Sequence, residues 1–236
     1  KSEVNTSPGW IEFEGYKTED AIDYGILSTE EIIAKSSNVG MVKLCADFES
    51  NQILQTYYSL GLGKYMNEIF ISTREGYLPE FKDLSPREKV SLCYGYGLQT
   101  TLIQLTSAYS TIFSNGLYRP LKLVNNSSQL TEKRILKENN AVSIKNILLQ
   151  AIQNGTGFRA KVKNQNVFGK TGTARIFKNQ QYNEDLHNAL FIGMTELDEK
   201  KYLVGLIVKD PKINGDGGGD VAAPIFSEII ETIQNF

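Results

Sequence analysis

Apolar residues are distributed in two different patterns along this chain. In the first part of the chain they recur every three or four positions, which is the spacing of one face of an α-helix. Between Val167 and Val208 they gather in short runs, rich in β-branched and aromatic residues and bounded by turn residues, a pattern typical of strands. Helices followed by strands in one chain of this size predict an α+β domain, in which helices flank an antiparallel sheet.

Start and stop signals locate the helices. Ser28 and Glu31 have the spacing of a capping box, and Ser85 is followed by a proline at the first helical position. Gly116 ends the helix that Thr101 opens. The predicted helices span about residues 29–36, 38–48, 51–60, 86–93, 101–114, 142–152 and 223–233.

The strand pattern predicts a small sheet. Its strands fall at residues 167–174, 189–194 and 203–208, and their short connections indicate an antiparallel meander. Residues 1–25 read as irregular chain with one short strand at 10–13, and residues 215–219 read as a flexible loop.

Composition excludes several classes of function. The 236 residues, 41% apolar and 22% charged, suit one globular domain, which we take to span residues 1–236. The net charge of −2 and the lack of a basic stripe argue against nucleic-acid binding. No apolar run approaches the roughly eighteen residues that a membrane span requires.

Cysteine, histidine and glycine usage adds no cofactor chemistry. Cys45 and Cys93 each lie in an apolar helical pattern, so we expect two buried free thiols rather than a disulfide. One histidine without clustered cysteines offers no metal site. No glycine-rich loop has the spacing that cradles a phosphate.

The most informative segment is Lys170-Thr171-Gly172-Thr173, on the first predicted strand. Because side chains alternate along a strand, Lys170 and Gly172 face one side and Thr171 and Thr173 the other. A twist or bulge at the end of the strand would bring the cation and the last hydroxyl toward one cleft. Gly172 leaves the backbone open to close approach by a ligand.

A second motif, Ser36-Ser37-Asn38, lies at the junction of two predicted helices. Ser-x-Asn and Lys-Thr-Gly, in this order, are two of the three motifs of active-serine penicillin-binding enzymes. The chain resembles the transpeptidase domain of class B penicillin-binding proteins, most closely the division-specific, penicillin-binding protein 3-like group. Further similar blocks lie at residues 61–63, 95–98, 116–120, 155–157, 169–174 and 218–224.

The resemblance implies acyl transfer through a serine ester. Ser36 would relay protons between nucleophile and leaving amine, and Asn38 would hold the substrate amide. Lys170 would supply positive potential. Thr171 and Thr173 would hydrogen-bond the substrate carboxylate, and the backbone N–H of Thr173 would form half of an oxyanion hole.

Two further residues are candidates for substrate binding. Tyr96, between two glycines, is a candidate for lining the cleft, although a packed tyrosine is nearly as good a reading. His187 stands where related proteins commonly carry an aromatic residue near the cleft mouth. It can stack on a ligand and also titrate near neutral pH, whereas the plain alternative is an exposed histidine on a loop.

The third motif, Ser-x-x-Lys, does not occur in this sequence. The family places its nucleophile there, roughly fifty residues before Ser-x-Asn. We therefore expect a partial domain without a nucleophile, inactive alone and partnered by a missing N-terminal part of the same protein. Related domains add two strands from that part beside residues 203–208. Without them, that strand would be an unpaired apolar edge prone to aggregation.

The function that the resemblance implies is a septal peptidoglycan D,D-transpeptidase, which cross-links stem peptides and is inhibited by β-lactam antibiotics. Its expected setting is the periplasmic face of the bacterial cytoplasmic membrane, with an upstream anchor outside this sequence and cell-division membrane proteins as partners. Three alternatives stay open: an elongation-type penicillin-binding protein, a serine β-lactamase and a non-catalytic paralogue that acts as a scaffold.

Overall fold

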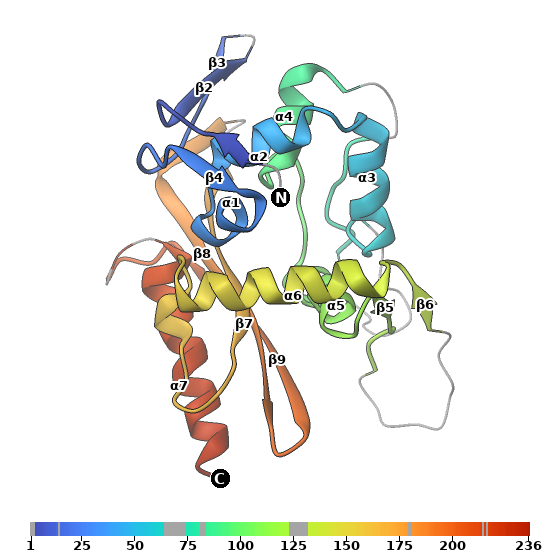
Figure 1. Cartoon of the computed structure of the whole chain (residues 1–236), viewed down its shortest axis with the longest axis vertical. Coiled ribbons are helices and arrows are strands. Elements are labelled where there is room, and N and C mark those ends of the chain that lie inside the picture. The colour runs from blue at the N-terminus through green and yellow to red at the C-terminus, as the bar shows by residue number, and fades with distance from the viewer. Residues whose placement is uncertain are drawn as a thin grey trace. The chain divides into compact units, whose positions relative to one another are not determined.

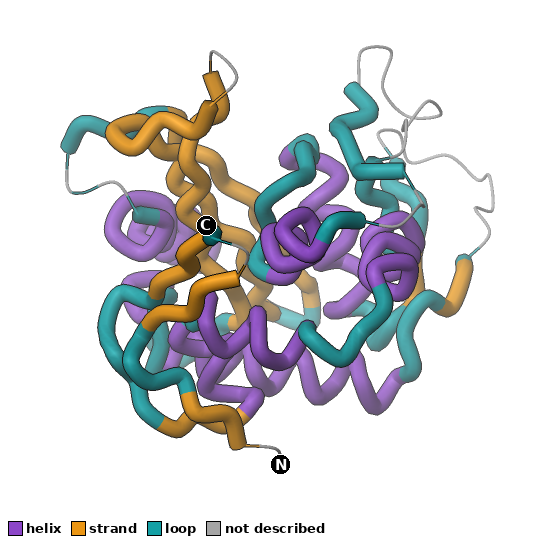
Figure 2. The backbone as a smooth tube through the Cα atoms, turned by 90° about the horizontal axis from the view of Figure 1, so that it is seen from above, coloured by secondary structure: helices purple, strands orange, loops and turns teal. Residues whose placement is uncertain are grey.

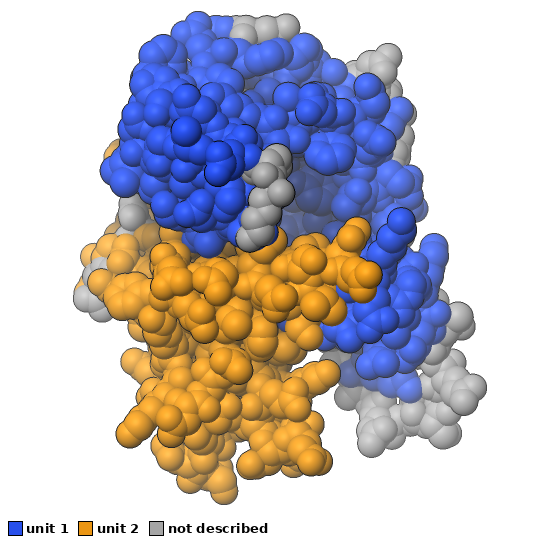
Figure 3. Space-filling view, viewed as in Figure 1, with its two compact units in different colours: residues 1–138 blue, residues 139–236 orange. Residues whose placement is uncertain are grey.

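The computed structural model of the chain describes residues 3–13, 15–63, 74–80, 84–122, 132–178, 181–213, 215 and 217–236. It divides into two compact units, residues 1–138 and residues 139–236, which Figure 3 shows in different colours. Within the similar block at residues 116–120, Leu117–Tyr118 form a strand of the first unit.

The first unit combines small two-stranded sheets with short helices (Figure 1). Strand β1 pairs antiparallel with β4, β2 with β3, and β5 with β6. Its elements are β1 (Glu3–Asn5), β2 (Trp10–Phe13), β3 (Tyr16–Glu19), β4 (Ile26–Ser28), α1 (Thr29–Lys35), α2 (Asn38–Cys45), α3 (Ser50–Ser59), α4 (Pro86–Cys93), α5 (Leu102–Phe113), β5 (Leu117–Tyr118) and β6 (Lys133–Arg134).

The expectation of irregular chain over residues 1–25 is wrong apart from β2. Strands β1 and β3 also form there, because each finds a partner that the local pattern does not reveal. Glu3 pairs with Ser28, and Trp10 pairs with Glu19. Strands of three or four residues are too short to show a period of two convincingly.

The predicted helix starts are confirmed where a capping residue marks them. Ser28, Ser85 and Thr101 each cap a helix, and in each case the capping box is complete. Helix α2 ends at Cys45, three residues before the expected end near Phe48. A capping side chain allows the start of a helix to be predicted from sequence. The end of α2 could not be predicted in this way, because no glycine follows it.

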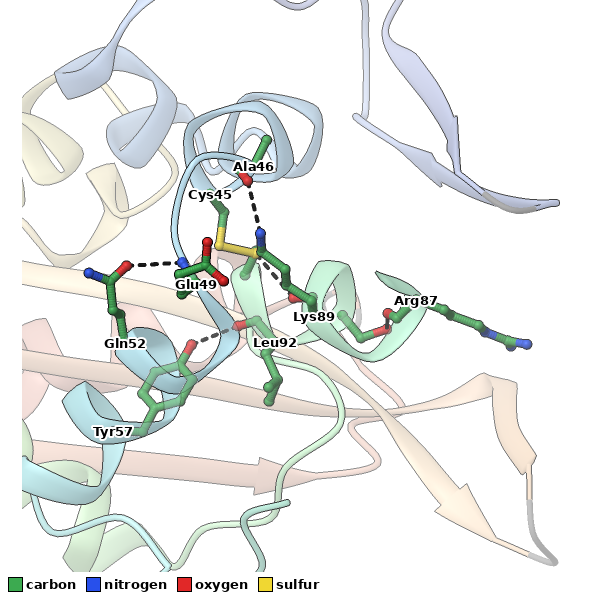
Figure 4. The surroundings of a disulfide bond; sticks show 10 residues. Cys45, Ala46, Glu49, Gln52, Tyr57, Arg87, Lys89 and Leu92 are labelled. Atoms are coloured by element: carbon green, nitrogen blue, oxygen red, sulfur yellow. Dashed lines mark hydrogen bonds between the residues drawn. A yellow bond between two sulfur atoms is a disulfide. The ribbon is translucent and has the colours of Figure 1, made fainter. Parts of the chain in front are cut away.

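Cys45 and Cys93 form a disulfide, so the expectation of two free thiols is wrong (Figure 4). Their Cα atoms lie 5.9 Å apart because α2 packs against α4, a tertiary contact across 48 residues of sequence. Around the bridge, Lys89 Nζ donates to the Ala46 carbonyl at 2.8 Å, and the Tyr57 hydroxyl donates to the Leu92 carbonyl at 2.7 Å. The end of α2 is therefore fastened to α4 by covalent and polar links.

The second unit is an antiparallel sheet in the order β7–β8–β9, with α7 packed against β8. Figure 2 draws the strands in orange and the helices in purple. This arrangement confirms the predicted meander and the α+β class. Helix α6 begins at the boundary of the two units and continues into the second. The elements are α6 (Glu138–Gln153), the 3₁₀ turn η1 (Phe158–Ala160), β7 (Phe168–Lys178), β8 (Gln181–Leu197), β9 (Lys200–Lys209), the π-helical turn η2 (Gly218–Ala222) and α7 (Ala223–Gln234).

Two expectations for this unit need correction. The strands β7 and β8 extend well beyond their apolar segments, because the two arms of the hairpin go on pairing through polar residues as far as Lys178 and Gln181. The loop expected at residues 215–219 instead becomes the turn η2 from Gly218 on, and it leads directly into α7.

The core of the second unit lies between the sheet and α7. Phe191 of β8 and Phe226 of α7 are fully buried, with ring centroids 5.0 Å apart. A Cβ atom at Gly193 would lie 2.5 Å from the Phe191 ring and 2.9 Å from the Phe226 ring, so only glycine fits there. This packing holds in place the sheet whose strand β7 carries residues 170–173 (the lysine motif).

Candidate active site

Residues 36–38 (the serine-asparagine motif) lie at the junction of α1 and α2, as expected. Ser36 is the C-cap of α1, Ser37 the N-cap of α2, and Asn38 the first residue of α2. Ser36 is exposed and adopts the left-handed conformation, with φ of 60° and ψ of 40°. Ser36 therefore lies at the surface of the first unit, at the point where the chain leaves α1 and enters α2.

The neighbouring residues are anchored to the end of β3. Ser37, which is fully buried, donates from Oγ to Asp20 Oδ2 at 2.6 Å. Asn38 Nδ2 donates to the Glu19 carbonyl at 3.0 Å, which fixes the side-chain amide with its nitrogen toward β3. Sequence reasoning missed Asp20, because only the packing of β3 against α2 brings it to the motif.

Tyr96 lies on the turn after α4, half-buried, with its N–H donating to the Ser91 carbonyl at 2.9 Å. The glycines on either side adopt left-handed conformations, with φ of 93° at Gly95 and 76° at Gly97. The Tyr94 and Tyr96 rings are 5.6 Å apart, and burial raises the pKa of Tyr94 to about 12. Tyr96 is thus held by its turn and by a neighbouring ring; its contact with a ligand stays a prediction.

The lysine motif lies in the regular part of β7. Lys170 pairs with Ile192 and Thr173 with Ala189, and the bulge in this pair of strands comes later, between Arg175 and Phe177. The alternation of faces through the motif therefore holds, and no bulge within it redirects the side chains. The half-buried Lys170 donates from Nζ to the Thr171 carbonyl at 3.1 Å. Burial lowers the pKa of its ammonium to about 8.

The two threonine hydroxyls of the motif have partners in the second unit. The Oγ1 atoms of Thr171 and Thr156 lie 2.7 Å apart. Thr173 Oγ1 accepts a hydrogen bond from the Gly218 N–H at 3.1 Å. Because that oxygen is already an acceptor, the single Thr173 hydroxyl proton is left to donate. Thr156 and Gly218 belong to blocks that the sequence analysis noted without a role.

Close approach occurs beside Gly172, and the approaching group is part of this chain. A Cβ atom at Gly218 would lie 2.5 Å from the Gly172 carbonyl oxygen and 2.2 Å from the Leu190 carbonyl oxygen. The start of η2 therefore lies directly against β7 and β8, and only glycine permits that contact.

His187 lies on β8, half-buried, and pairs with Arg175 of β7. The alternative of an exposed loop histidine is wrong, since its carbonyl accepts from the Asp210 N–H at 2.8 Å as part of ordered structure. It shares the sheet with the lysine motif, whereas Ser36, Asn38 and Tyr96 belong to the first unit.

Metal and membrane features are lacking among the residues that the structure describes. No group of three acidic, cysteine or histidine side chains there is arranged to hold a metal ion. None of the described helices combines the length and the hydropathy needed to cross a bilayer.

Comparison with known proteins gives a consistent result. Residues 1–231 match the family model described as "Penicillin binding protein transpeptidase domain". The chain is 35% identical over 208 residues to the probable peptidoglycan D,D-transpeptidase PenA of Neisseria gonorrhoeae, covering 88% of this chain and 36% of the relative. It is 30% identical over 230 residues to the peptidoglycan D,D-transpeptidase FtsI of Escherichia coli K12, covering 97% and 39%.

Solved structures resemble the chain equally well. The transpeptidase domain of Burkholderia pseudomallei penicillin-binding protein 3 superimposes with a TM-score of 0.91 at 28% identity, covering 99% of this chain and 72% of that one. Penicillin-binding protein 3 of Mycobacterium tuberculosis, complexed with aztreonam, gives 0.86 at 25% identity, covering 97% and 56%. The chain spans about two fifths or less of the length of these curated relatives, PenA and FtsI.

Proposed function

The chain belongs to the penicillin-binding protein transpeptidase family, and from that premise we propose that it is part of a peptidoglycan D,D-transpeptidase of the division type. The longer protein would cross-link stem peptides through a serine acyl-enzyme. The relatives named as D,D-transpeptidases and the structural neighbours named penicillin-binding protein 3 support this assignment.

The single observation that carries the proposal is the arrangement of donors on β7. Thr171 and Thr173 lie on one face of β7, where the Thr173 hydroxyl proton is left to donate, and the half-buried Lys170 on the same strand adds positive charge. Donors of this kind suit an anionic ligand such as the carboxylate at the end of a stem peptide or of a β-lactam. Thr171, linked to Thr156, would add a second hydroxyl, and the Thr173 N–H would stabilise the oxyanion of the acyl-transfer intermediate.

The junction in the first unit would contribute proton transfer and substrate orientation. Ser36 is an exposed residue, and in this proposal its hydroxyl relays a proton between nucleophile and leaving amine. Asn38 would use its side-chain oxygen to accept from the substrate amide, since its nitrogen is held by Glu19. Tyr96 and His187 are proposed to contact substrate or antibiotic.

The nucleophile would come from a Ser-x-x-Lys segment of the longer protein, because no such segment occurs in these 236 residues. The chain alone would accordingly form no acyl-enzyme. The Cys45–Cys93 disulfide supports exposure to an oxidising compartment, in keeping with the periplasmic face of the cytoplasmic membrane. Peptidoglycan stem peptides, β-lactams and division proteins would be its partners.

The test is covalent labelling of the full-length protein with a fluorescent penicillin. We expect one stable adduct per molecule and no labelling of a variant in which the serine of Ser-x-x-Lys is replaced by alanine. Labelling that disappears by hydrolysis within minutes would indicate a β-lactamase instead. Failure of the folded full-length protein to label would contradict the proposal and favour a scaffold. Depletion in growing cells distinguishes a block in septation, which we expect, from loss of rod shape.

A further inference from the structure

We propose that Asn154 is a site of spontaneous deamidation, and that the isoaspartate formed there displaces Thr156 from its contact with Thr171 in the lysine motif. The modification itself depends on this chain alone, whereas its effect on acylation rests on the acyl-transfer function proposed above. The protein would lose activity as it ages, at a rate set by one exposed turn of the second unit.

The reaction is favoured where glycine follows asparagine. The backbone nitrogen of Gly155, after losing its proton to water or hydroxide, attacks Cγ of Asn154. A bond forms between these two atoms, the bond from Cγ to Nδ2 breaks, and ammonia leaves. Water then opens the resulting succinimide ring at either carbonyl, which gives aspartate or isoaspartate. Glycine favours the attack because it places no side chain in the path and its backbone rotates readily.

The sequence contains three Asn-Gly pairs, at residues 115–116, 154–155 and 214–215. Asn214 lies outside the described residues, so the structure distinguishes between the other two pairs. Asn154 is exposed and directly follows Gln153, the last residue of α6. Among the residues that the structure describes, none accepts a hydrogen bond from the Gly155 N–H. The attacking nitrogen therefore gives up no hydrogen bond of the fold when it reacts.

One hydrogen bond restrains the Asn154 side chain. Its Nδ2 donates to Gln150 Oε1 at 2.9 Å, and both side chains are exposed. A bond between two neutral, exposed groups is exchanged for bonds to water at small cost. Gln150 thus slows ring closure without preventing it, and removal of its side chain should speed the reaction.

The pair at residues 115–116 is protected by the fold. Gly116 is buried, and its N–H donates to the Thr111 carbonyl at 2.8 Å. Asn115 is held in the left-handed region with φ of 54°, and its carbonyl accepts from Arg134 Nη1 at 2.9 Å. The nitrogen that would attack is already bonded, and the peptide after Asn115 is held in place. The same dipeptide therefore serves as an internal control.

Isoaspartate at residue 154 changes the turn that carries Thr156. Its main chain runs through Cβ and Cγ, which lengthens the chain by one carbon, and it adds a negative charge at the C-terminal end of α6, where the helix dipole is also negative. Beyond Thr156 the turn is fixed. The Gly157 N–H donates to the Ala151 carbonyl at 3.0 Å, and a Cβ atom at Gly157 would lie 2.6 Å from Ile152 Cδ1. The added carbon must therefore be accommodated between residues 154 and 156.

Thr156 connects that turn to the lysine motif. Its Oγ1 lies 2.7 Å from Thr171 Oγ1, and its carbonyl oxygen would lie 2.6 Å from a Cβ atom at Gly219 of η2. A hydrogen bond weakens steeply once its distance and angle leave a narrow range. A displacement comparable to a carbon–carbon bond breaks the contact and removes the group that orients the Thr171 hydroxyl.

The first experiment incubates the folded full-length protein at pH 8.5 and maps its peptides by mass spectrometry, in which deamidation adds about one mass unit. We expect Asn154 to convert at least about tenfold faster than Asn115, and the two to convert at similar rates in the urea-unfolded chain. Gly155→Ala should slow the conversion of Asn154, and Gln150→Ala should speed it. Equal conversion of Asn154 and Asn115 in the folded protein, or a difference that persists after unfolding, would overturn the proposal.

The second experiment compares penicillin acylation of fresh and incubated protein. The wild type should lose acylation rate in proportion to the isoaspartate found at residue 154. Asn154→Gln should keep its rate, because glutamine closes the corresponding six-membered ring far more slowly. Parallel losses in both proteins would exclude Asn154 as the cause.

A crystal structure of the isoaspartate form decides the displacement without any activity. Separation of Thr156 from Thr171 supports the proposal, and an unchanged contact refutes it. A fresh wild-type protein that does not acylate would contradict the proposed function alone, because the peptide map measures the modification independently of acylation.

Discussion

Thr156 and Thr171 place their hydroxyl oxygens 2.7 Å apart, one on the turn after α6 and the other on β7. In such a pair one hydroxyl donates to the other, so one of the two protons is held between them and the other remains to donate elsewhere. The pair therefore orients Thr171 within the lysine motif, even though Thr156 lies outside it.

Replacing Thr156 by valine tests this relationship, since valine keeps the branched shape and removes the hydroxyl. We expect penicillin acylation of the full-length protein to slow about three- to tenfold, the loss of one neutral hydrogen bond of about 0.5–1.5 kcal/mol. Thr232→Val is the control, because the Thr232 hydroxyl bonds only within its helix, to the Glu228 carbonyl at 2.7 Å. Equal rates in the two variants would show that Thr156 does not orient Thr171.

Gly218→Ala should destabilise the protein by about 1–3 kcal/mol, because its methyl group would be forced against the backbone of β7 and β8. Gly217→Ala is the neighbouring comparison, since the closest atom to its Cβ would be Thr173 Oγ1 at 3.4 Å, an ordinary contact. Thermal unfolding of both variants checks this. A melting temperature for Gly218→Ala equal to that of Gly217→Ala would mean that η2 moves away from the sheet at no cost.

The titration of Lys170 predicts a pH dependence. Burial lowers its pKa from 10.5 to about 8, so the ammonium loses its charge as the pH rises through about 8. The acylation rate of the full-length protein should fall over that range. Lys170→Arg should remove this alkaline limb, whatever its absolute rate, because arginine stays charged. A limb that persists in Lys170→Arg would assign the titration to another group.

The same shift affects folding stability in a defined direction. Between pH 8 and 10.5 the unfolded chain binds more protons at Lys170 than the folded chain, so this group's contribution to stability rises with pH in that window. Urea unfolding of wild type and Lys170→Met at pH 7.5 and 9.5 measures it. The wild type should gain stability relative to the variant at the higher pH, and a relative loss would contradict the direction of the shift.

Removal of the Cys45–Cys93 disulfide should lower the free energy of unfolding by about 2–4 kcal/mol, as expected for a bridge that closes a loop of 48 residues. The measurement is urea unfolding with and without a reducing agent. The reductant should shift the midpoint of the wild type and leave Cys45→Ala/Cys93→Ala unchanged. If the urea midpoint of the wild type does not change after full reduction, the disulfide adds no stability.

Strand β9 pairs only with β8 among the described residues, which agrees with the expected open edge. We predict that the 236-residue chain aggregates through this edge and that Ile207→Lys, an exposed position on β9, slows the aggregation. Phe236→Lys removes a more exposed apolar side chain at the C-terminal end and should have little effect. Light scattering of the three proteins compares them; equal rates for both variants would exclude β9 as the contact.

The sequence was sufficient for much of the local structure. The helix starts at Ser28, Ser85 and Thr101 could be predicted, because a capping side chain and its partner lie three residues apart in the sequence. The strand that carries Lys170 could be predicted because Val167 and Phe168 precede the motif and Ala174 follows it in a short segment bounded by turn residues. The family could be recognised because its motifs are short local strings in a fixed order.

Contacts between distant segments were decided only by the tertiary structure. The disulfide requires α2 to pack against α4, the support of Ser37 by Asp20 requires β3 to lie beside α2, and the donor role of Thr173 requires Gly218 to lie against β7. Each joins residues far apart in sequence, where no spacing rule applies. The sequence by itself determined which groups could perform the chemistry, and the folded chain decided which hydrogen bonds those groups had already made and therefore which protons and lone pairs remain for a substrate.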